Sequence, residues 1–230
     1  MVFIKTPEYN FQISTHLLSA NIVYYEKKYY TLVSAYDLYS IGLDLLYYDY
    51  NWNKNSLEHS TDKTNHLTVY YNNDIPYILA GNYQNIKVFD FAQKKLIKSF
   101  FDPDKDNINY NTVIIYENEK DLKDIICSCS DGYIRIWDYN SNLFKHAIFS
   151  GFQGWLVGLC LIDQKYLLAG CGDGNIKEFN LDTKNLIFTL NRDSVPNDRL
   201  FTIKFYEINS KRYLISHSDE GIIEIWEEEI

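Results

Sequence analysis

The sequence has few arginines and no long run of basic residues. Its 230 residues include only four arginines, and the formal net charge is −9. Binding to a phosphate backbone requires a concentrated basic surface, and the nearest candidate here is one pair, Lys94 and Lys95. The charge balance therefore argues against a nucleic-acid partner.

Cysteine is scarce too. The four residues Cys127, Cys129, Cys160 and Cys171 all lie in apolar stretches, whereas a secreted disulfide framework is denser and based on loops. Cys127 and Cys129 are two apart, on one face of a strand, but no second pair of zinc ligands follows at a suitable spacing. We expect reduced thiols in a cytoplasmic chain, with no metal and no cofactor.

Long apolar runs are also missing. No stretch reaches the ~18 apolar residues of a membrane span. The uncharged segment 146–162 is interrupted by glutamine and by three glycines. The N-terminal residues lack the charged head and apolar core of a secretion signal. We predict a cytoplasmic protein without membrane insertion.

Enzyme motifs are absent from the sequence. It contains no glycine-rich phosphate loop, no His-Glu-x-x-His and no Gly-x-Ser-x-Gly. A five-bladed glycosidase would need paired carboxylates on its inner strands, but Glu117 and Glu207 fall at strand ends. We predict a non-catalytic protein and keep a glycosidase-like enzyme as a remote alternative.

What the sequence does contain is a repeat of short β-prone segments. Each copy ends in an aromatic residue followed by an acidic or amide residue, namely Asp49, Asp90, Asp138, Asn180 and Glu227. These anchors are 41, 48, 42 and 47 residues apart. A period of that size, built only from short strands, is typical of β-propellers and β-solenoids. The longest loop candidate is the polar stretch Asn51 to Asn65.

Turn signals separate the strands within each copy. The dipeptides Asp131-Gly132 and Asp173-Gly174 supply the positive φ that a tight hairpin needs, and in the second copy we expect Asn85 to do so. After the turn, the residue types alternate between the two faces of the strand from Tyr133 to Trp137. This alternation predicts that one face of the sheet is more exposed to water than the other.

Two segments, SDGYIRIWD (130–138) and GDGNIKEFN (172–180), resemble the WD-repeat β-propeller family. The resemblance covers about Ala20 to Glu228. It implies that the first strand of each repeat lines a central channel and that two sets of loops share one face. It also implies a structural role for the motif residues Asp131, Gly132, Trp137, Asp138, Asp173, Gly174 and Trp226.

The family closes its ring by sharing one blade between the two termini. By this resemblance we predict a single domain, residues 1–230, with five four-stranded blades. A strand within residues 2–13 would complete the last blade, residues 212–228. A fragment of a seven-bladed propeller is the alternative. The family's Gly-His is replaced here by Gly151-Phe152, so we expect apolar packing between sheets to supply most of the stability.

The resemblance implies a protein–protein interaction scaffold that binds a partner protein or peptide through its loops. Aromatic residues and arginine dominate such contacts, and the candidates in or beside the loop face are Tyr83, Tyr133, Phe152, Trp155 and Arg199. The family's phosphoinositide-binding Arg-Arg is absent. The alternative function is a structural subunit built permanently into a larger assembly, which would expose a large apolar patch.

Overall fold

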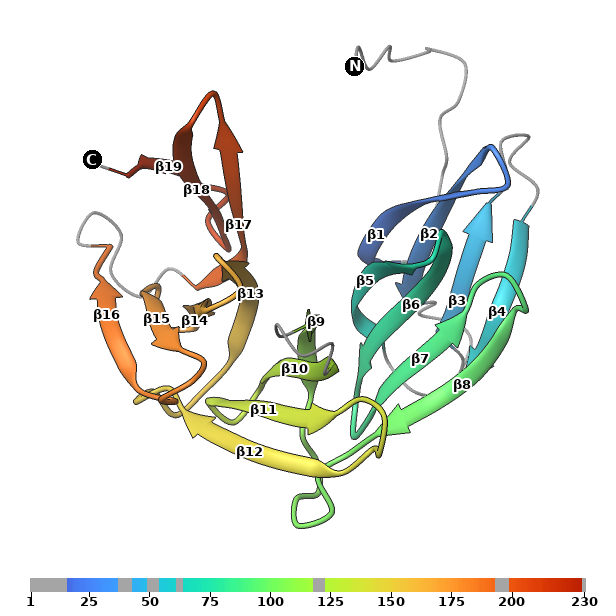
Figure 1. The fold of residues 1–230 in the computed structure, drawn as a ribbon, viewed down its shortest axis with the longest axis horizontal. Coiled ribbons are helices and arrows are strands. Elements are labelled where there is room, and N and C mark those ends of the chain that lie inside the picture. Colours follow the sequence, from blue (N-terminus) through green and yellow to red (C-terminus); the bar gives the residue numbers. More distant parts are fainter. Residues whose placement is uncertain are drawn as a thin grey trace.

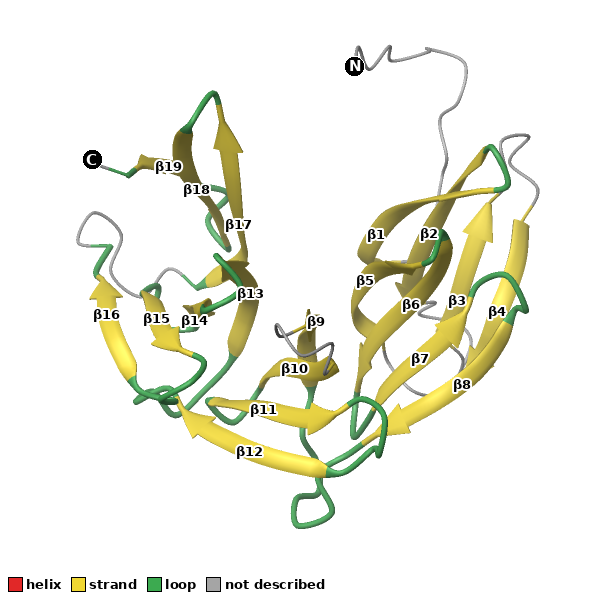
Figure 2. Cartoon of the chain, in the orientation of Figure 1, coloured by secondary structure: helices red, strands yellow, loops and turns green. Residues whose placement is uncertain are grey.

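The computed structural model describes residues 16–36, 43–48, 54–60, 64–117, 123–192 and 199–228. Regular structure in these residues is entirely β-strand, arranged in antiparallel sheets (Figure 2). The prediction of an all-β propeller arrangement is therefore confirmed. Within the described ranges there is no helix of the length and apolar character that a membrane crossing needs.

Each sheet is formed by strands that are consecutive in the chain. The first sheet contains β1 (His16–Tyr25), β2 (Lys28–Tyr36), β3 (Leu43–Tyr48) and β4 (Lys54–Ser60). The second contains β5 (Thr64–Asn72), β6 (Ile75–Asn82), β7 (Ile86–Asp90) and β8 (Lys95–Phe100). The third contains β9 (Tyr110–Glu117), β10 (Lys123–Cys129), β11 (Tyr133–Asp138) and β12 (Phe144–Phe149). The fourth contains β13 (Leu156–Ile162), β14 (Tyr166–Cys171), β15 (Ile176–Asn180) and β16 (Leu186–Leu190). The last contains β17 (Leu200–Ile208), β18 (Lys211–Ser218) and β19 (Ile223–Glu227).

The sheets follow one another around an arc, with the first and last sheets at its two ends (Figure 1). Four sheets have four strands each, and the last has three. The structure therefore shows four four-stranded blades, where five were predicted, because the last sheet has only three strands among the described residues. The strand expected within residues 2–13 lies outside the described residues.

The expected long loop at Asn51 to Asn65 is wrong. Lys54–Ser60 forms β4, which pairs with β3, and β5 already begins at Thr64. The reason is the position of the strand. The outermost strands β8, β12 and β16 are mostly exposed, so a polar composition is compatible with strand structure there.

The predicted glycine turns are confirmed, with φ of 84° at Gly132 and 86° at Gly174. The expectation for Asn85 is wrong, because Gln84 takes the positive φ of 71° instead. Asn85 is held by Asn82, whose backbone N–H donates to the Asn85 carbonyl (2.9 Å) and whose Nδ2 donates to Asn85 Oδ1 (3.0 Å).

Both faces of β11 are buried, which overturns the expected wetter face. Trp137 packs into a cluster shared with the second sheet, beside Phe100 and Val88. On the opposite face, Ile134 and Ile136 pack into a cluster shared with the fourth sheet. A strand inside a blade lies between two neighbouring blades, so alternation along it separates two interfaces rather than core from solvent.

Arg135, the charged residue in the middle of β11, connects the turn before β11 to the loop before β9. Arg135, only 1% exposed, donates from Nε to Asp102 Oδ2 (2.8 Å). Its Nη1 and Nη2 donate to the two carboxylate oxygens of Asp131, at 2.7 Å each. Nε1 of Trp137 donates to the backbone carbonyl of Phe101 (3.1 Å). This buried network ties sheet, turn and loop together.

The next two sheets repeat the connection with different residues. In the fourth, Lys177 on β15 donates from Nζ to the carbonyl of Ser150 (2.9 Å). In the last, the signs are reversed, since Arg192 of the loop pairs with Glu224 on β19. Each of these loops is therefore fastened to the sheet that follows it in the chain.

The remaining motif residues serve turns and packing. The carboxylate of Asp138 accepts hydrogen bonds from the backbone N–H (2.7 Å) and hydroxyl (2.8 Å) of Ser141. Asp173 accepts one from the backbone N–H of Asn175 (3.0 Å). Trp226 is half-buried and packs against the cluster between the fourth and last sheets.

Candidate functional site

The inner strands of the sheets are joined side by side by polar side chains. Nδ2 of Asn21 donates to the carbonyl of Leu67 (3.4 Å). The same group of Asn111 donates to the carbonyl of Leu156 (2.7 Å). Between these two pairs, the hydroxyl of Thr68 donates to the carbonyl of Val113 (2.6 Å). The first four inner strands are therefore held next to one another around a common space.

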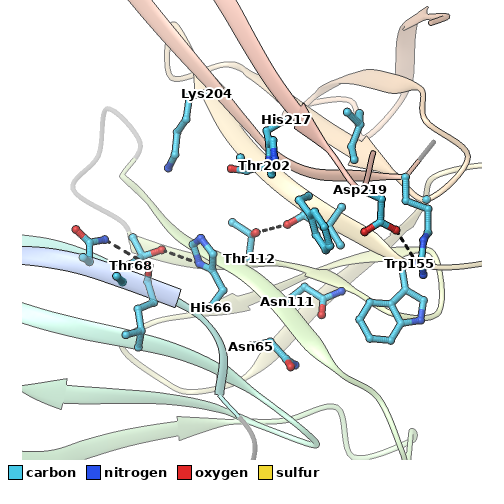
Figure 3. Close-up of a pocket in the computed structure, with 18 of the residues that line it drawn as sticks. Asn65, His66, Thr68, Asn111, Thr112, Trp155, Thr202, Lys204, His217 and Asp219 are labelled. Atoms are coloured by element: carbon cyan, nitrogen blue, oxygen red, sulfur yellow. Dashed lines mark hydrogen bonds and ion pairs between the residues drawn. The ribbon is translucent and has the colours of Figure 1, made fainter. Parts of the chain in front are cut away.

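That space is a cavity of about 940 Å³ lined by all five inner strands, β1, β5, β9, β13 and β17 (Figure 3). The expectation that the first strand of each repeat lines a central channel is thus confirmed. A volume of this size is at the upper end of the range for small-molecule sites.

The ionisable residues of the cavity lie mainly on two sheets. Lys204 and His217 come from the last sheet and His66 from the second. Two more lie in loops, where Arg199 Nη2 pairs with Asp219 Oδ2 at 2.6 Å. The lining is therefore cationic on balance, although the chain as a whole carries −9.

His66 is held in a defined tautomer. The Thr68 hydroxyl donates its proton to Val113, so its oxygen accepts from Nδ1 of His66 (3.4 Å). Nε2 then carries the lone pair. Burial and, to a smaller extent, the nearby charge of Lys204 together lower the pKa of His66 to about 4. The ring is neutral at physiological pH.

This lowered pKa predicts a loss of stability in acid. The unfolded chain takes up the proton near the ordinary pKa of 6.5, whereas the folded chain takes it up only near 4. The contribution of His66 is therefore complete above pH 6.5 and declines as the pH falls toward 4, by about 1–3 kcal/mol.

Urea unfolding at pH 7 and at pH 4.5 measures this loss. We expect His66→Gln to lose less stability over the same interval than the unchanged chain. An equal loss in the two proteins would contradict the assigned role of His66.

Two of the predicted binding residues meet at the cavity. Trp155 directly precedes β13 and is 43% exposed, and Arg199 directly precedes β17. The two residues are held in the same way, because Trp155 accepts a backbone hydrogen bond from Gly172 (2.7 Å) and Arg199 accepts one from Asp219 (2.8 Å). Each is thereby fixed against a turn of its own sheet, at the same end of the channel.

The other three predicted residues lie away from the cavity. The hydroxyl of Tyr83 donates to Asn107 (2.5 Å) beside the loop before β9. Tyr133 packs its ring on Phe149, with centroids 5.0 Å apart. Phe152 is half-buried against the cluster between the third and fourth sheets. The candidate set is therefore divided between the channel mouth and the outer parts of the loop face.

Sequence reasoning missed His66, Lys204 and His217. None of the turn, motif or aromatic signals in the sequence points to these three residues. Aligning the polar positions of the first strand in every repeat would have revealed His66 on β5 and Lys204 on β17, whereas His217 lies on β18, the second strand of its sheet.

The thiols offer no nucleophile. Cys127, Cys129 and Cys171 are buried, Cys160 is half-buried, and all four are free. Burial raises the pKa of Cys160 and of Cys171 to about 12, which disfavours the reactive thiolate. Among the described residues, no three His, Cys, Asp or Glu side chains are grouped as metal ligands.

The carboxylates considered for glycoside hydrolysis do not line the cavity. Glu117 lies at the end of β9, where it accepts a hydrogen bond from Tyr70 and pairs with Lys123 (2.7 Å). The hydrogen bonds from Lys123 and Tyr70 lower the pKa of Glu117. This shift is opposite to the one that a general acid requires. Glu207 is an exposed residue near the end of β17.

No protein-family model matches the chain, and no curated protein matches it either.

Proposed function

We propose that the chain is a WD-type propeller that acts as a non-catalytic interaction scaffold and binds a partner peptide at the channel mouth. One observation carries this proposal. Trp155 and Arg199 are 43% and 62% exposed, and they stand beside the exposed ring of Phe201 at the rim of one cavity. Tryptophan and arginine supply a large share of the energy in protein interfaces.

The proposal includes a ring of five blades in a cytoplasmic protein. Five sheets in series support the blade number, and the three-stranded last sheet leaves room for one strand from residues 2–13. The four free cysteines support the compartment, because oxidising surroundings favour disulfides.

Peptide selection against the immobilised chain tests the function. We expect selected peptides to bind Trp155→Ala about 10- to 100-fold more weakly than the unchanged chain, because an anchor at the rim is lost. Isothermal titration calorimetry measures the affinities. Phe188→Ala is the matched control, since Phe188 is also an exposed aromatic residue (55%) and lies on the outer strand β16. Equal affinity for Trp155→Ala and Phe188→Ala would contradict binding at the mouth.

A second function, that of a structural subunit in a larger assembly, is favoured by a different surface. On the last sheet, Tyr206, Ile223 and Ile225 lie on the face directed away from the fourth sheet, and the two isoleucines are 66% and 64% exposed. Apolar surface of this kind marks interaction sites. Gel filtration separates the two functions, because a free scaffold elutes as a monomer and a structural subunit elutes as an associated or aggregated species.

A further inference from the structure

The charge of the cavity is opposite to that of the chain. Its only carboxylate among the described residues is Asp219, and Arg199 already pairs with it. No described residue forms an ion pair with Lys204. The cavity therefore contains one ammonium group whose charge its own lining leaves uncompensated.

Three polar side chains of the last sheet face the channel together. Lys204 is two residues after Thr202 on β17, so both project from the same face of the sheet. His217 is directly opposite Thr202 on β18, and its ring stacks on Phe201 with centroids 6.0 Å apart. His66 extends toward the same space from β5 (Figure 3).

We propose that the channel binds an oxyanion, a phosphate or a carboxylate, between Lys204 and Thr202 of the last sheet and His66 of the second. Lys204 supplies the charge, and the Thr202 hydroxyl and the imidazoles supply directed hydrogen bonds. This small-molecule site lies inside the channel and goes beyond the peptide-binding function proposed for the mouth.

The rest of the cavity restricts the kind of molecule that carries the oxyanion. Its wall includes the exposed rings of Trp155 and Phe201 and the aliphatic residues Val69 and Val157. A small inorganic ion would leave this apolar surface in contact with water. The lining therefore fits an organic anion with a flat apolar body, which stacks on the rings while its charged group reaches Lys204.

Binding of an oxyanion is coupled to the proton on His66. Nε2 holds a lone pair in the neutral ring, so it must be protonated before it can donate to an anion. Lys204 is the charged group that acts on His66, and His217 and the Arg199–Asp219 pair line the same cavity; the lining residues of β1 and β9 are uncharged. A bound anion offsets the repulsion from Lys204, so the complex takes up a proton.

Phenyl phosphate and benzoate are suitable probes, and phenol is the matched compound without the oxyanion. We expect calorimetry at low salt to give a dissociation constant on the order of 0.1–1 mM for at least one of the two anions. Comparing the anions identifies phosphate or carboxylate as the preferred group. Inorganic phosphate alone is expected to bind more weakly, since it leaves the apolar wall uncovered.

Lys204→Met tests the assigned cation. We expect it to weaken binding by about tenfold or more, because a charge-assisted contact is lost. Lys211→Met is the control on the same sheet, since Lys211 pairs with Glu227 (2.5 Å) outside the cavity, and it is expected to bind as the unchanged chain does. Lys204→Gln is a second variant, which keeps a polar side chain but removes the charge. We expect it to weaken anion binding by the same factor as Lys204→Met.

Three results would overturn the proposal. The first is the absence of saturable binding of both anions at 10 mM, a concentration about tenfold above the expected constant. The second is phenol binding as tightly as the anions. The third is unchanged affinity in both Lys204 variants. Calorimetry in two buffers with different ionisation enthalpies measures proton uptake near pH 5.5, which we expect to disappear in His66→Gln. A failure of peptide binding at the mouth leaves these measurements unaffected.

Discussion

Replacing Trp137 with alanine is expected to lower the free energy of unfolding by about 3–5 kcal/mol. Trp137 is fully buried and contacts the rings of Phe100, Tyr110 and Phe144, with centroid separations of 6.5, 5.7 and 5.6 Å. Truncation removes these contacts and the hydrogen bond to Phe101, and leaves a cavity between the second and third sheets. For a domain of this size, the melting temperature should fall by roughly 6–20 °C.

Trp155→Ala is the matched control, because it removes the same side chain from an exposed position. We expect it to change the melting temperature by only a few degrees, in keeping with surface substitutions. Calorimetry on the two variants, side by side, measures the difference. An unchanged melting curve for Trp137→Ala would show that the third sheet is not packed as described.

Arg135→Met is expected to destabilise the chain by about 3–5 kcal/mol, since it leaves the buried carboxylate of Asp102 and the partly exposed carboxylate of Asp131 without a cation. Asp102 is 6% exposed and is held by Nε of Arg135 at 2.8 Å. Methionine fills much of the same volume, so the loss reports mainly on charge rather than on packing. Chemical denaturation measures it.

The control for charge is Lys145→Met, which breaks the pair between the 40% exposed side chain of Lys145 and the 12% exposed side chain of Asp124 within the same sheet. Solvent screens that pair, and we expect a loss of about 1 kcal/mol or less. Adding Asp102→Asn to Arg135→Met should recover part of the stability, because one of the unpaired charges is removed. Equal losses in Arg135→Met and Lys145→Met would mean that the buried network contributes no more than a surface pair.

Local pattern carries most of the information about the strands of this fold. The glycine turns and the apolar strands between them are visible in the sequence because each depends on neighbouring residues. Strand β4 was missed because an outer strand needs no apolar face. Asn85 was assigned the wrong backbone angle because its hydrogen bonds to Asn82, rather than its intrinsic tolerance, decide the turn.

The candidate site depends on contacts that local pattern does not contain. Trp155 and Arg199 could be placed at one end of the channel because the order of antiparallel strands puts those loops on one face. The approach of His66 to Lys204 could not be predicted, since it joins the second sheet to the last across the channel. The periodicity fixes which residues face inward, but only the curvature of the arc decides which of them meet.

The reversed ion pair of the last sheet has a consequence for assembly. Arg135 on β11 pairs with a carboxylate of the preceding loop, Asp102. Glu224 on β19 pairs with a cation of the preceding loop, Arg192. If the loop containing Arg192 docked on the third sheet, the guanidinium groups of Arg192 and Arg135 would be buried together. If the loop containing Asp102 docked on the last sheet, the carboxylates of Asp102 and Glu224 would be buried together. Similar repeats can pair with the wrong neighbour during folding. The signs of these charges disfavour the wrong pairings, so each loop docks on its own blade.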